Sequence, residues 1–287
     1  MAELPEVRAM TEVIAPKLEL YTIRSVVVNN AAILSNGNTM EFKEAVINRT
    51  ITSVNSFGKT LVVNFSDGAK MRVKFALTGE LDITREIPTG VDVVLGLCNG
   101  TYVSIVDHRH FAKIIIEPPF QNIEEMELPD IAQKVVTSVV SSCPDAMSGV
   151  IAPEYVFKMA NRSSVSIKTL LCDQSIIAGI GNTYADEILF RAAINPTRKA
   201  DTLSIRDCEE LTKAIHSVLS EFIKVSREYA KEDFRLSKVE KYTHKFTEVH
   251  GRSDCHVCGS RIKYIRLAGK GTYFCEKCQG VAYASYL

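Results

Sequence analysis

Residues 255–278 read CHVCGSRIKYIRLAGKGTYFCEKC, and this stretch decides the fold of the last part of the chain. Two Cys-x-x-Cys pairs, Cys255/Cys258 and Cys275/Cys278, are separated by 16 residues. Each pair can place two thiolates on one tetrahedral metal, and the intervening length fits a β-hairpin that brings the pairs together. We therefore predict one structural Zn2+ ion bound by these four cysteines. An iron–sulfur cluster or a redox-active dithiol is the alternative.

The residues between the cysteine pairs predict the strands of that hairpin at 261–266 and 272–274, with a tip at 267–271. Lys270 lies between two glycines at this tip, a placement that suits contact with a phosphate. The alternative is a flexible turn with a solvated lysine. Because four thiolates leave no open coordination position, the metal is expected to be structural rather than catalytic.

Composition indicates a folded protein of a reducing compartment. The chain has 287 residues, 46% of them hydrophobic, which is enough for two domains with a buried core. The other four cysteines, Cys98, Cys143, Cys172 and Cys208, lie among apolar neighbours and indicate buried thiols rather than disulfides. There is no long apolar run and no secretory signal at the start. We expect a cytoplasmic or nuclear monomer that is not secreted and has no membrane partner.

The charges sum to zero but are distributed unevenly along the chain. Lys and Arg total 34, as do Asp and Glu, so the net charge is zero. Residues 223–287 nevertheless carry 13 basic against 7 acidic side chains, while residues 118–150 are acidic. A basic C-terminal part can face phosphates, although the charges alone suit an ordinary solvated surface equally well.

Hydrophobic periodicity divides the rest of the chain into a β-rich and a helical part. A helix at 5–15 is expected to end at Pro16, and β-type runs follow from 23 to 117, with a hairpin at 60–75. Two further strands are expected at 101–106 and 112–117. The pattern then becomes helical at 131–141, 154–160, 167–173 and 208–225, and a glycine turn at 180–183 opens a helix that runs to 190.

These elements predict an α+β fold with an N-terminal helix plus an antiparallel β-sandwich, then a helix–two-turn–helix domain and a C-terminal zinc-ribbon hairpin. The predicted boundaries are 1–117 for the sandwich, 118–150 for a linker and first helix, 151–246 for the helical domain and 247–287 for the zinc hairpin.

Six motifs, in order over nearly the whole chain, together resemble the formamidopyrimidine-DNA glycosylase and endonuclease VIII family of base-excision-repair enzymes. They are Glu3-Leu4-Pro5-Glu6-Val7, Gly58-Lys59, Leu77-Thr78-Gly79, Asp107-His108-Arg109-His110-Phe111, Gly179-Ile180-Gly181-Asn182-Thr183-Tyr184-Ala185 and Val249-His250-Gly251-Arg252. The resemblance implies removal of an oxidised base and cleavage of the strand at the resulting abasic site. The implied partner is DNA that contains oxidised bases or abasic sites.

The resemblance also implies catalytic roles. The amine of Ala2, exposed by removal of Met1, would attack sugar C1′ and form a Schiff base, and a helix start behind it would lower its pKa. Glu3 would act as general acid and base, Glu6 would support the local geometry, and Lys59 would contact a phosphate near the lesion. The family usually has proline at position 2. Ala2 is therefore a natural nucleophile, an inactivating replacement, or the mark of a lineage that relies on Lys59 or is inactive; the first two are favoured.

Other matched positions imply contacts with DNA whose damaged base has left the stack. Leu77 and Phe111 would fill and wedge the gap, and Arg109 would face the widowed base, whereas core packing is the plain alternative for the two apolar side chains. Asn182, Lys270 and Lys168 would hold the kinked backbone at its phosphates. A different class of function, a non-catalytic zinc-ribbon protein that binds damaged or bent DNA, would use the same DNA contacts without a free amine. Residues 234–246 lack glycine and proline, which favours the endonuclease VIII branch.

Overall fold

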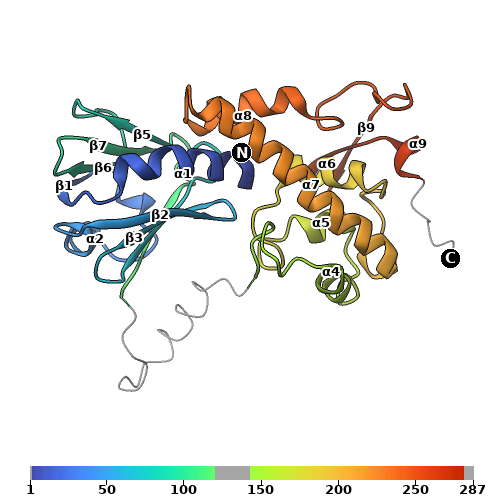
Figure 1. The fold of residues 1–287 in the computed structure, drawn as a ribbon, viewed down its shortest axis with the longest axis horizontal. Coiled ribbons are helices and arrows are strands. Elements are labelled where there is room, and N and C mark those ends of the chain that lie inside the picture. The colour runs from blue at the N-terminus through green and yellow to red at the C-terminus, as the bar shows by residue number, and fades with distance from the viewer. Residues whose placement is uncertain (1, 120–142, 281–287) are drawn as a thin grey trace, which may run out of the picture. The chain divides into compact units, whose positions relative to one another are not determined.

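The structure is a computed structural model that describes residues 2–119 and 143–280 (Figure 1). These residues separate into two compact units. The first contains residues up to 119 together with 225–242, and the second contains 143–224 and 243–280. Each unit combines two separate stretches of the chain, whereas the sequence analysis divided the chain into four consecutive segments. Those four segments stay a prediction. The helix expected at 131–141 lies outside the described residues.

Two antiparallel four-stranded sheets form the body of the first unit. One sheet has the order β1-β6-β7-β5, and its strands are β1 (Ile23–Val28), β6 (Val93–Leu97), β7 (Tyr102–Val106) and β5 (Glu80–Thr84). The other has the order β2-β3-β4-β8, and its strands are β2 (Ile51–Phe57), β3 (Thr60–Phe65), β4 (Lys70–Lys74) and β8 (Lys113–Glu117). The predicted antiparallel sandwich is confirmed, including the hairpin at 60–75 and the strands near 101–106 and 112–117.

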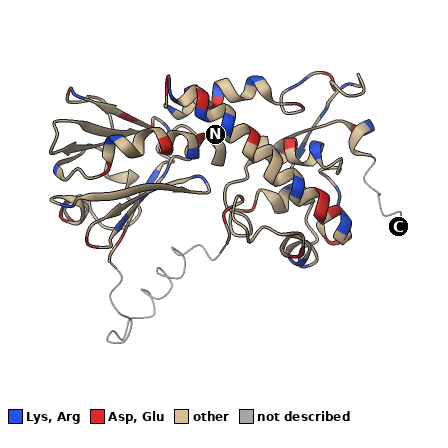
Figure 2. Ribbon diagram, in the orientation of Figure 1, with Lys and Arg blue, Asp and Glu red and all other residues tan. Residues whose placement is uncertain are grey.

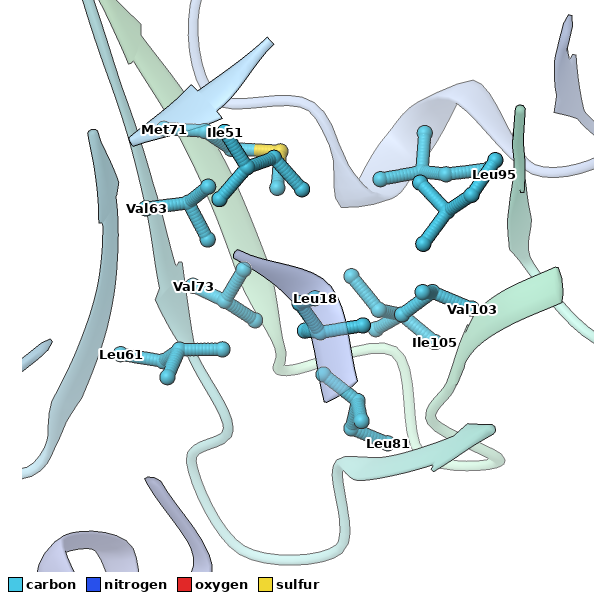
Figure 3. Close-up of a pocket in the computed structure, with 11 residues that line it drawn as sticks. Leu18, Ile51, Leu61, Val63, Met71, Val73, Leu81, Leu95, Val103 and Ile105 are labelled. Atoms are coloured by element: carbon cyan, nitrogen blue, oxygen red, sulfur yellow. The ribbon is translucent and has the colours of Figure 1, made fainter. Parts of the chain in front are cut away.

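Aliphatic side chains from both sheets meet in the interior of the sandwich (Figure 3). Val63 and Val73 come from one sheet and Val103 and Ile105 from the other, and all four are buried. Burial of each such side chain stabilises the fold by about 1.5–3 kcal/mol. Leu18 reaches the same interior from the N-terminal helix.

The N-terminal helix α1 spans Leu4–Leu18 and packs against β2. The expected end at Pro16 was wrong, because the helix continues through this proline to Leu18. Leu18 is 2% exposed, so burial of its side chain favours the last helical turn over an early stop. On the other side of α1, Glu12 forms an ion pair with Arg227, and Ala9 packs in a small apolar cluster. A second helix that the β-type pattern hid, α2, spans Thr39–Val46.

The second unit is helical and ends in the hairpin. Its described elements, together with the helices that continue into the first unit, are α4 (Pro153–Ala160), α5 (Ile167–Leu171), α6 (Asn182–Arg191), α7 (Ile205–Ala230), α8 (Leu236–Thr243), β9 (Lys263–Leu267), β10 (Lys270–Phe274) and α9 (Glu276–Gln279). Basic and acidic residues both occur along α7 (Figure 2), and Lys213 pairs there with Glu210. None of the helices in the described part of the chain is both long and apolar enough to cross a bilayer.

The hairpin differs from its prediction at the tip. Ala268 and Gly269 form a two-residue turn with φ values of 46° and 77°, so the strands run to Leu267 and from Lys270. A turn with two positive φ values matches the twist of an antiparallel pair, which explains why five expected tip residues shrink to two. Lys270 therefore begins strand β10 and pairs with Leu267.

Candidate active site and zinc centre

The proposed catalytic residues at the chain start are buried at the first turn of α1. Ala2 is 8% exposed, Glu3 2% and Glu6 1%. The backbone N–H of Glu3 donates to the Glu6 carboxylate at 2.9 Å, which fixes the geometry of the turn. A buried carboxylate at the positive end of a helix is favoured by the helix dipole. Position 2 is adjacent to Glu3 in the chain, so an amine there would stand beside an ordered carboxylate.

Lys59 occupies the two-residue turn between β2 and β3, where Phe57 pairs with Thr60. Gly58 precedes it with a φ of 54°, a conformation that glycine adopts without steric cost. Gly58 is buried, while Lys59 is half-buried. The Gly-Lys motif therefore holds the lysine at a fixed hairpin end, within the unit that contains Glu3.

The residues expected to enter the DNA gap are exposed. Leu77 is 44% exposed and Phe111 is 50% exposed, so core packing, the plain alternative for both, does not account for them. Arg109 is also exposed, and its guanidinium lies 5.3 Å from the centre of the Phe111 ring. An aliphatic side chain, an aromatic ring and a guanidinium are thus exposed on two loops of the first unit, 76–79 and 107–112.

A residue that the motifs contained but did not single out, Asp107, orders the second of these loops. Its buried carboxylate accepts the backbone N–H groups of Arg109, Phe111 and Ala112 at 3.1, 2.8 and 2.6 Å. It also accepts the hydroxyl of Thr78 from the first loop at 2.6 Å. The only signal in the sequence was the position of an aspartate at the head of the Asp-His-Arg-His-Phe stretch.

The four predicted zinc ligands converge in the second unit. The sulfur atoms of Cys255, Cys258, Cys275 and Cys278 all lie within 4.8 Å of one another. Cys255 and Cys278 are separated by 3.8 Å and Cys258 and Cys275 by 3.5 Å, close to the ~3.8 Å edge of a tetrahedron with zinc–sulfur bonds of about 2.3 Å. Hydrogen bonds with Ser260 lower the pKa of Cys258 to about 6, and the neighbouring Cys258 thiol raises the pKa of Cys278 to about 12. Four sulfur ligands without an open position fit one structural zinc ion.

Lys168, which was predicted to hold a DNA phosphate, is buried and paired with a carboxylate in this structure, and the phosphate contact stays a prediction. The Lys168 side chain is 1% exposed, and its ammonium lies 2.6 Å from the Asp186 carboxylate. The same nitrogen donates to the carbonyl of Gly271 at 2.8 Å and to the hydroxyl of Thr272 at 2.9 Å. A basic residue in a sequence cannot reveal whether a carboxylate already neutralises it. Lys168 joins α6 to strand β10 next to Lys270.

Two acidic residues directly after the Gly-Asn-Thr-Tyr turn tie α6 to the zinc hairpin. The Asp186 carboxylate accepts a hydrogen bond from Nδ1 of the His250 ring at 2.7 Å and one from the backbone N–H of Tyr273 at 3.1 Å. Glu187 accepts three backbone N–H groups, from residues 248, 249 and 250, at 2.6 to 3.0 Å. Burial raises the pKa of Glu187, and those three donors offset part of that effect. The segment Val249–Arg252 is thereby anchored by α6, which sequence reasoning did not anticipate.

Asn182 and Lys270 remain available for phosphate contact. Asn182 is the first residue of α6, where backbone N–H groups point out of the helix, and Gly181 is its N-cap. The side-chain oxygen of Asn182 is buried without a hydrogen-bond partner among the described residues. Lys270 is exposed at the start of β10. Both lie in the second unit, together with the zinc ligands.

Three family models match the chain in the order of its motifs. The formamidopyrimidine-DNA glycosylase N-terminal domain matches residues 1–114, and the formamidopyrimidine-DNA glycosylase H2TH domain matches residues 143–233. A zinc finger found in FPG and IleRS matches residues 254–281. Together with the site geometry, these matches define the class as a base-excision-repair DNA glycosylase that also cleaves abasic sites.

Individual relatives match over almost the whole length. A formamidopyrimidine-DNA glycosylase from Pelotomaculum thermopropionicum is 31% identical over 98% of this chain and 100% of its own. Another from Desulforamulus reducens is 30% identical over 97% and 99%. The crystal structure of MutM (Fpg) from Thermus thermophilus superposes with a TM-score of 0.78 at 26% identity, covering 96% of this chain and 98% of that one. The chain belongs to the formamidopyrimidine-DNA glycosylase family.

The fold is also that of the Lactococcus lactis Fpg in its complex with abasic-site DNA, with a TM-score of 0.81 at 21% identity over 96% and 99% of the two chains. The predicted α+β fold and the zinc-ribbon hairpin are confirmed by these matches and by the strand order. A non-catalytic DNA-binding protein is not favoured, because the matched family consists of glycosylases.

Proposed function

We propose that the α-amine of Ala2, exposed when Met1 is removed, is the nucleophile of this glycosylase. The amine attacks C1′ of the damaged nucleotide, the base leaves, and the sugar ring opens to a Schiff base. Loss of a proton from C2′ then expels the 3′ phosphate and cleaves the strand. The observation that carries the proposal is the pair of buried glutamates, Glu3 and Glu6, at the first turn of α1 directly after position 2.

Glu3 is the general acid and base of this scheme. As an acid it protonates the ring oxygen O4′ when the sugar opens, and as a base it accepts a proton during elimination. Glu6 acts as a positioning residue, because its carboxylate receives the Glu3 N–H and so fixes the backbone next to the amine. Ala2 supplies a primary amine, which forms an imine that is reactive when protonated, whereas the secondary amine of the family's usual proline forms an iminium ion. Lys59 contacts a phosphate beside the lesion and assists elimination.

The proposed DNA contacts use groups of both units, which are exposed except for the half-buried Asn182. Leu77 fills the space left by the everted base, Phe111 wedges the stack and Arg109 faces the unpaired base opposite. Asn182 and Lys270 bind phosphates. The ligand is DNA with an oxidised base or an abasic site, consistent with the abasic-site DNA bound by the Lactococcus lactis protein. The four zinc thiolates suit a reducing compartment, cytoplasmic or nuclear.

Borohydride trapping tests the nucleophile. Reduction in the presence of abasic-site DNA should yield a covalent adduct between protein and DNA. Peptide mapping should place the attached DNA on residue 2, and the intact mass should show that Met1 is absent. An adduct on Lys59 would instead support the lineage that relies on this lysine. The absence of any adduct from protein with a free residue-2 amine would refute the proposal and leave the DNA-binding alternative.

The role of Glu3 has a matched control on the same helix. Glu3→Gln should lower base release by about a hundredfold or more, the range that general acid–base catalysis contributes. Glu12 also lies in α1 and forms an exposed ion pair with Arg227. Glu12→Gln should leave the rate of base release within about twofold of wild type, because exposed ion pairs contribute little. Single-turnover release of the base measures both variants. Equal rates for Glu3→Gln and wild type would contradict the assignment.

The lesion preference remains a prediction. Residues 234–246, which lack glycine and proline, favour oxidised pyrimidines or further-oxidised purines over 8-oxopurines. Single-turnover rates on duplexes that differ only in the lesion would decide the preference.

A further inference from the structure

The two loops that present the plug and the wedge of the first unit share one buried carboxylate. Leu77 lies on the loop between β4 and β5, and Phe111 lies on the loop between β7 and β8. Asp107 begins the second loop and is only 1% exposed, although Phe111 in the same loop is exposed. The two loops therefore meet below their exposed tips.

All acceptor positions of this carboxylate are used. One oxygen accepts the Thr78 hydroxyl at 2.6 Å and the Arg109 N–H at 3.1 Å. The other accepts the N–H groups of Phe111 and Ala112 at 2.8 and 2.6 Å. A carboxylate offers about four acceptor sites, so the group is saturated. Thr78 is the only partner from the plug loop among the described residues, and it is 29 positions from Asp107 in sequence.

The electrostatics agree with an ionised, tightly held group. Burial by itself would raise the pKa of Asp107, but the hydrogen bonds from Thr78 and from the loop backbone lower it below its usual value. The backbone N–H of Asp107 in turn donates to the buried Asp92 carboxylate at 2.6 Å. Asp92 also accepts the Asn30 amide, so the node is fixed to the sandwich.

The ends of the plug loop are set by the backbone conformations of Ala76 and Gly79. Ala76 has a φ of 52°, a strained value for alanine, and Gly79 has no room for a side chain because a Cβ would lie 2.4 Å from the Phe75 carbonyl oxygen. The loop thus turns sharply at both ends of Leu77-Thr78. The Thr78 hydroxyl is what ties its centre to the wedge loop.

We propose that the Thr78–Asp107 hydrogen bond couples the Leu77 plug to the Arg109–Phe111 wedge, so that both enter the duplex together when the damaged base is everted. Thr78 and Asp107 are then positioning residues for eversion, not catalytic residues. The inference rests on the proposed function. It predicts that breaking the bond slows removal of a stacked base but spares chemistry on an abasic site, which has no base to evert.

Thr78→Val removes the hydroxyl at nearly constant volume, and Thr78→Ser retains it. Hydrogen bonds to charged groups are strong, so base excision by Thr78→Val in a duplex should fall about tenfold to a hundredfold. Borohydride trapping on abasic-site DNA should stay within about threefold of wild type, and Thr78→Ser should restore excision. Equal excision by Thr78→Val and wild type would overturn the proposal, as would equal losses in excision and trapping.

Eversion itself can be followed without chemistry. In Glu3→Gln protein, the fluorescence of a 2-aminopurine next to the lesion should rise more slowly when Thr78→Val is added. In that background Leu77→Ala should have far less effect than it has alone, because the plug is already misplaced. Independent, multiplying effects would refute the coupling. If wild type forms no adduct with abasic-site DNA, the proposed function fails, while this fluorescence signal still decides the coupling.

Discussion

Replacement of Asp186 by asparagine tests the buried charge cluster behind the zinc hairpin. Within the second unit, the Asp186 carboxylate receives the Lys168 ammonium at 2.6 Å, the His250 ring at 2.7 Å and the Tyr273 N–H at 3.1 Å. Asparagine keeps the shape but removes the negative charge. Lys168, 1% exposed, would then face only the neutral oxygens of Gly271 and Thr272 among its described partners.

The expected loss of stability depends on which charge or hydrogen-bonding group each variant leaves unpaired. Removing one partner of a buried ion pair typically costs about 3–5 kcal/mol because the other charge remains uncompensated. We expect about 3 kcal/mol for Asp186→Asn, since its carbonyl oxygen can still accept one hydrogen bond. Lys168→Met should cost less, about 2 kcal/mol, because Asp186 retains two donors. The order of the two variants is therefore itself a prediction.

Urea unfolding of the zinc-bound protein measures the loss, and the rate of zinc release to a chromogenic chelator reports on the hairpin. The control is Lys213→Met, which breaks an exposed pair with Glu210 and should leave stability unchanged within the error of the measurement. A loss below about 1 kcal/mol for Asp186→Asn, with unchanged zinc release, would refute the view that this cluster holds the hairpin.

Two further predictions concern the metal and the pH. Chelation of zinc should abolish amide-exchange protection at 263–274 and weaken binding to abasic-site DNA, while the sandwich strands keep their protection; unchanged hairpin protection would contradict a structural metal. Because the native pKa of Asp107 is lowered, its stabilising effect is present above the unfolded pKa and is lost as pH falls through the native one. The stability difference between wild type and Asp107→Asn should thus be constant above about pH 5 and shrink below about pH 4, and a difference that grows in acid would contradict the assignment.

Local sequence signals predicted those elements whose stabilising contacts are themselves local. The Ser-Asp-Gly turn between alternating apolar runs predicted the β3–β4 hairpin, and two cysteine pairs predicted the zinc site. The helix α2 was missed because its eight residues, Thr39–Val46, lie within a β-rich region and bury only Phe42 and Val46. Pro16 was expected to end α1. The helix continues because Leu18 is buried in the sandwich, a tertiary contact that the local sequence does not reveal.

Motifs in the sequence name exposed side chains of the candidate site, but not buried partners that are distant in the chain. Leu77, Arg109 and Phe111 come from such motifs and are exposed, while their DNA contacts stay a prediction. The burial of Lys168 could not be predicted, because its partners, Asp186 and Thr272, are 18 and 104 positions away. Buried nodes of this kind need the tertiary fold before any hydrogen bond can be assigned.

Those buried nodes also explain how a chain with zero net charge can bind a polyanion. Among the described residues the buried charged side chains are seven acids and one base, namely Glu3, Glu6, Asp92, Asp107, Asp145, Asp186, Glu187 and Lys168. The described residues carry 33 basic and 30 acidic side chains, and leaving out the buried ones gives 32 against 23, an excess of nine positive charges. Several of the buried carboxylates accept backbone N–H groups, so their charge organises loops rather than repelling phosphates. Among these buried acids, Asp107 orders one of the loops proposed to touch DNA, and Glu187 anchors the segment that precedes the zinc hairpin.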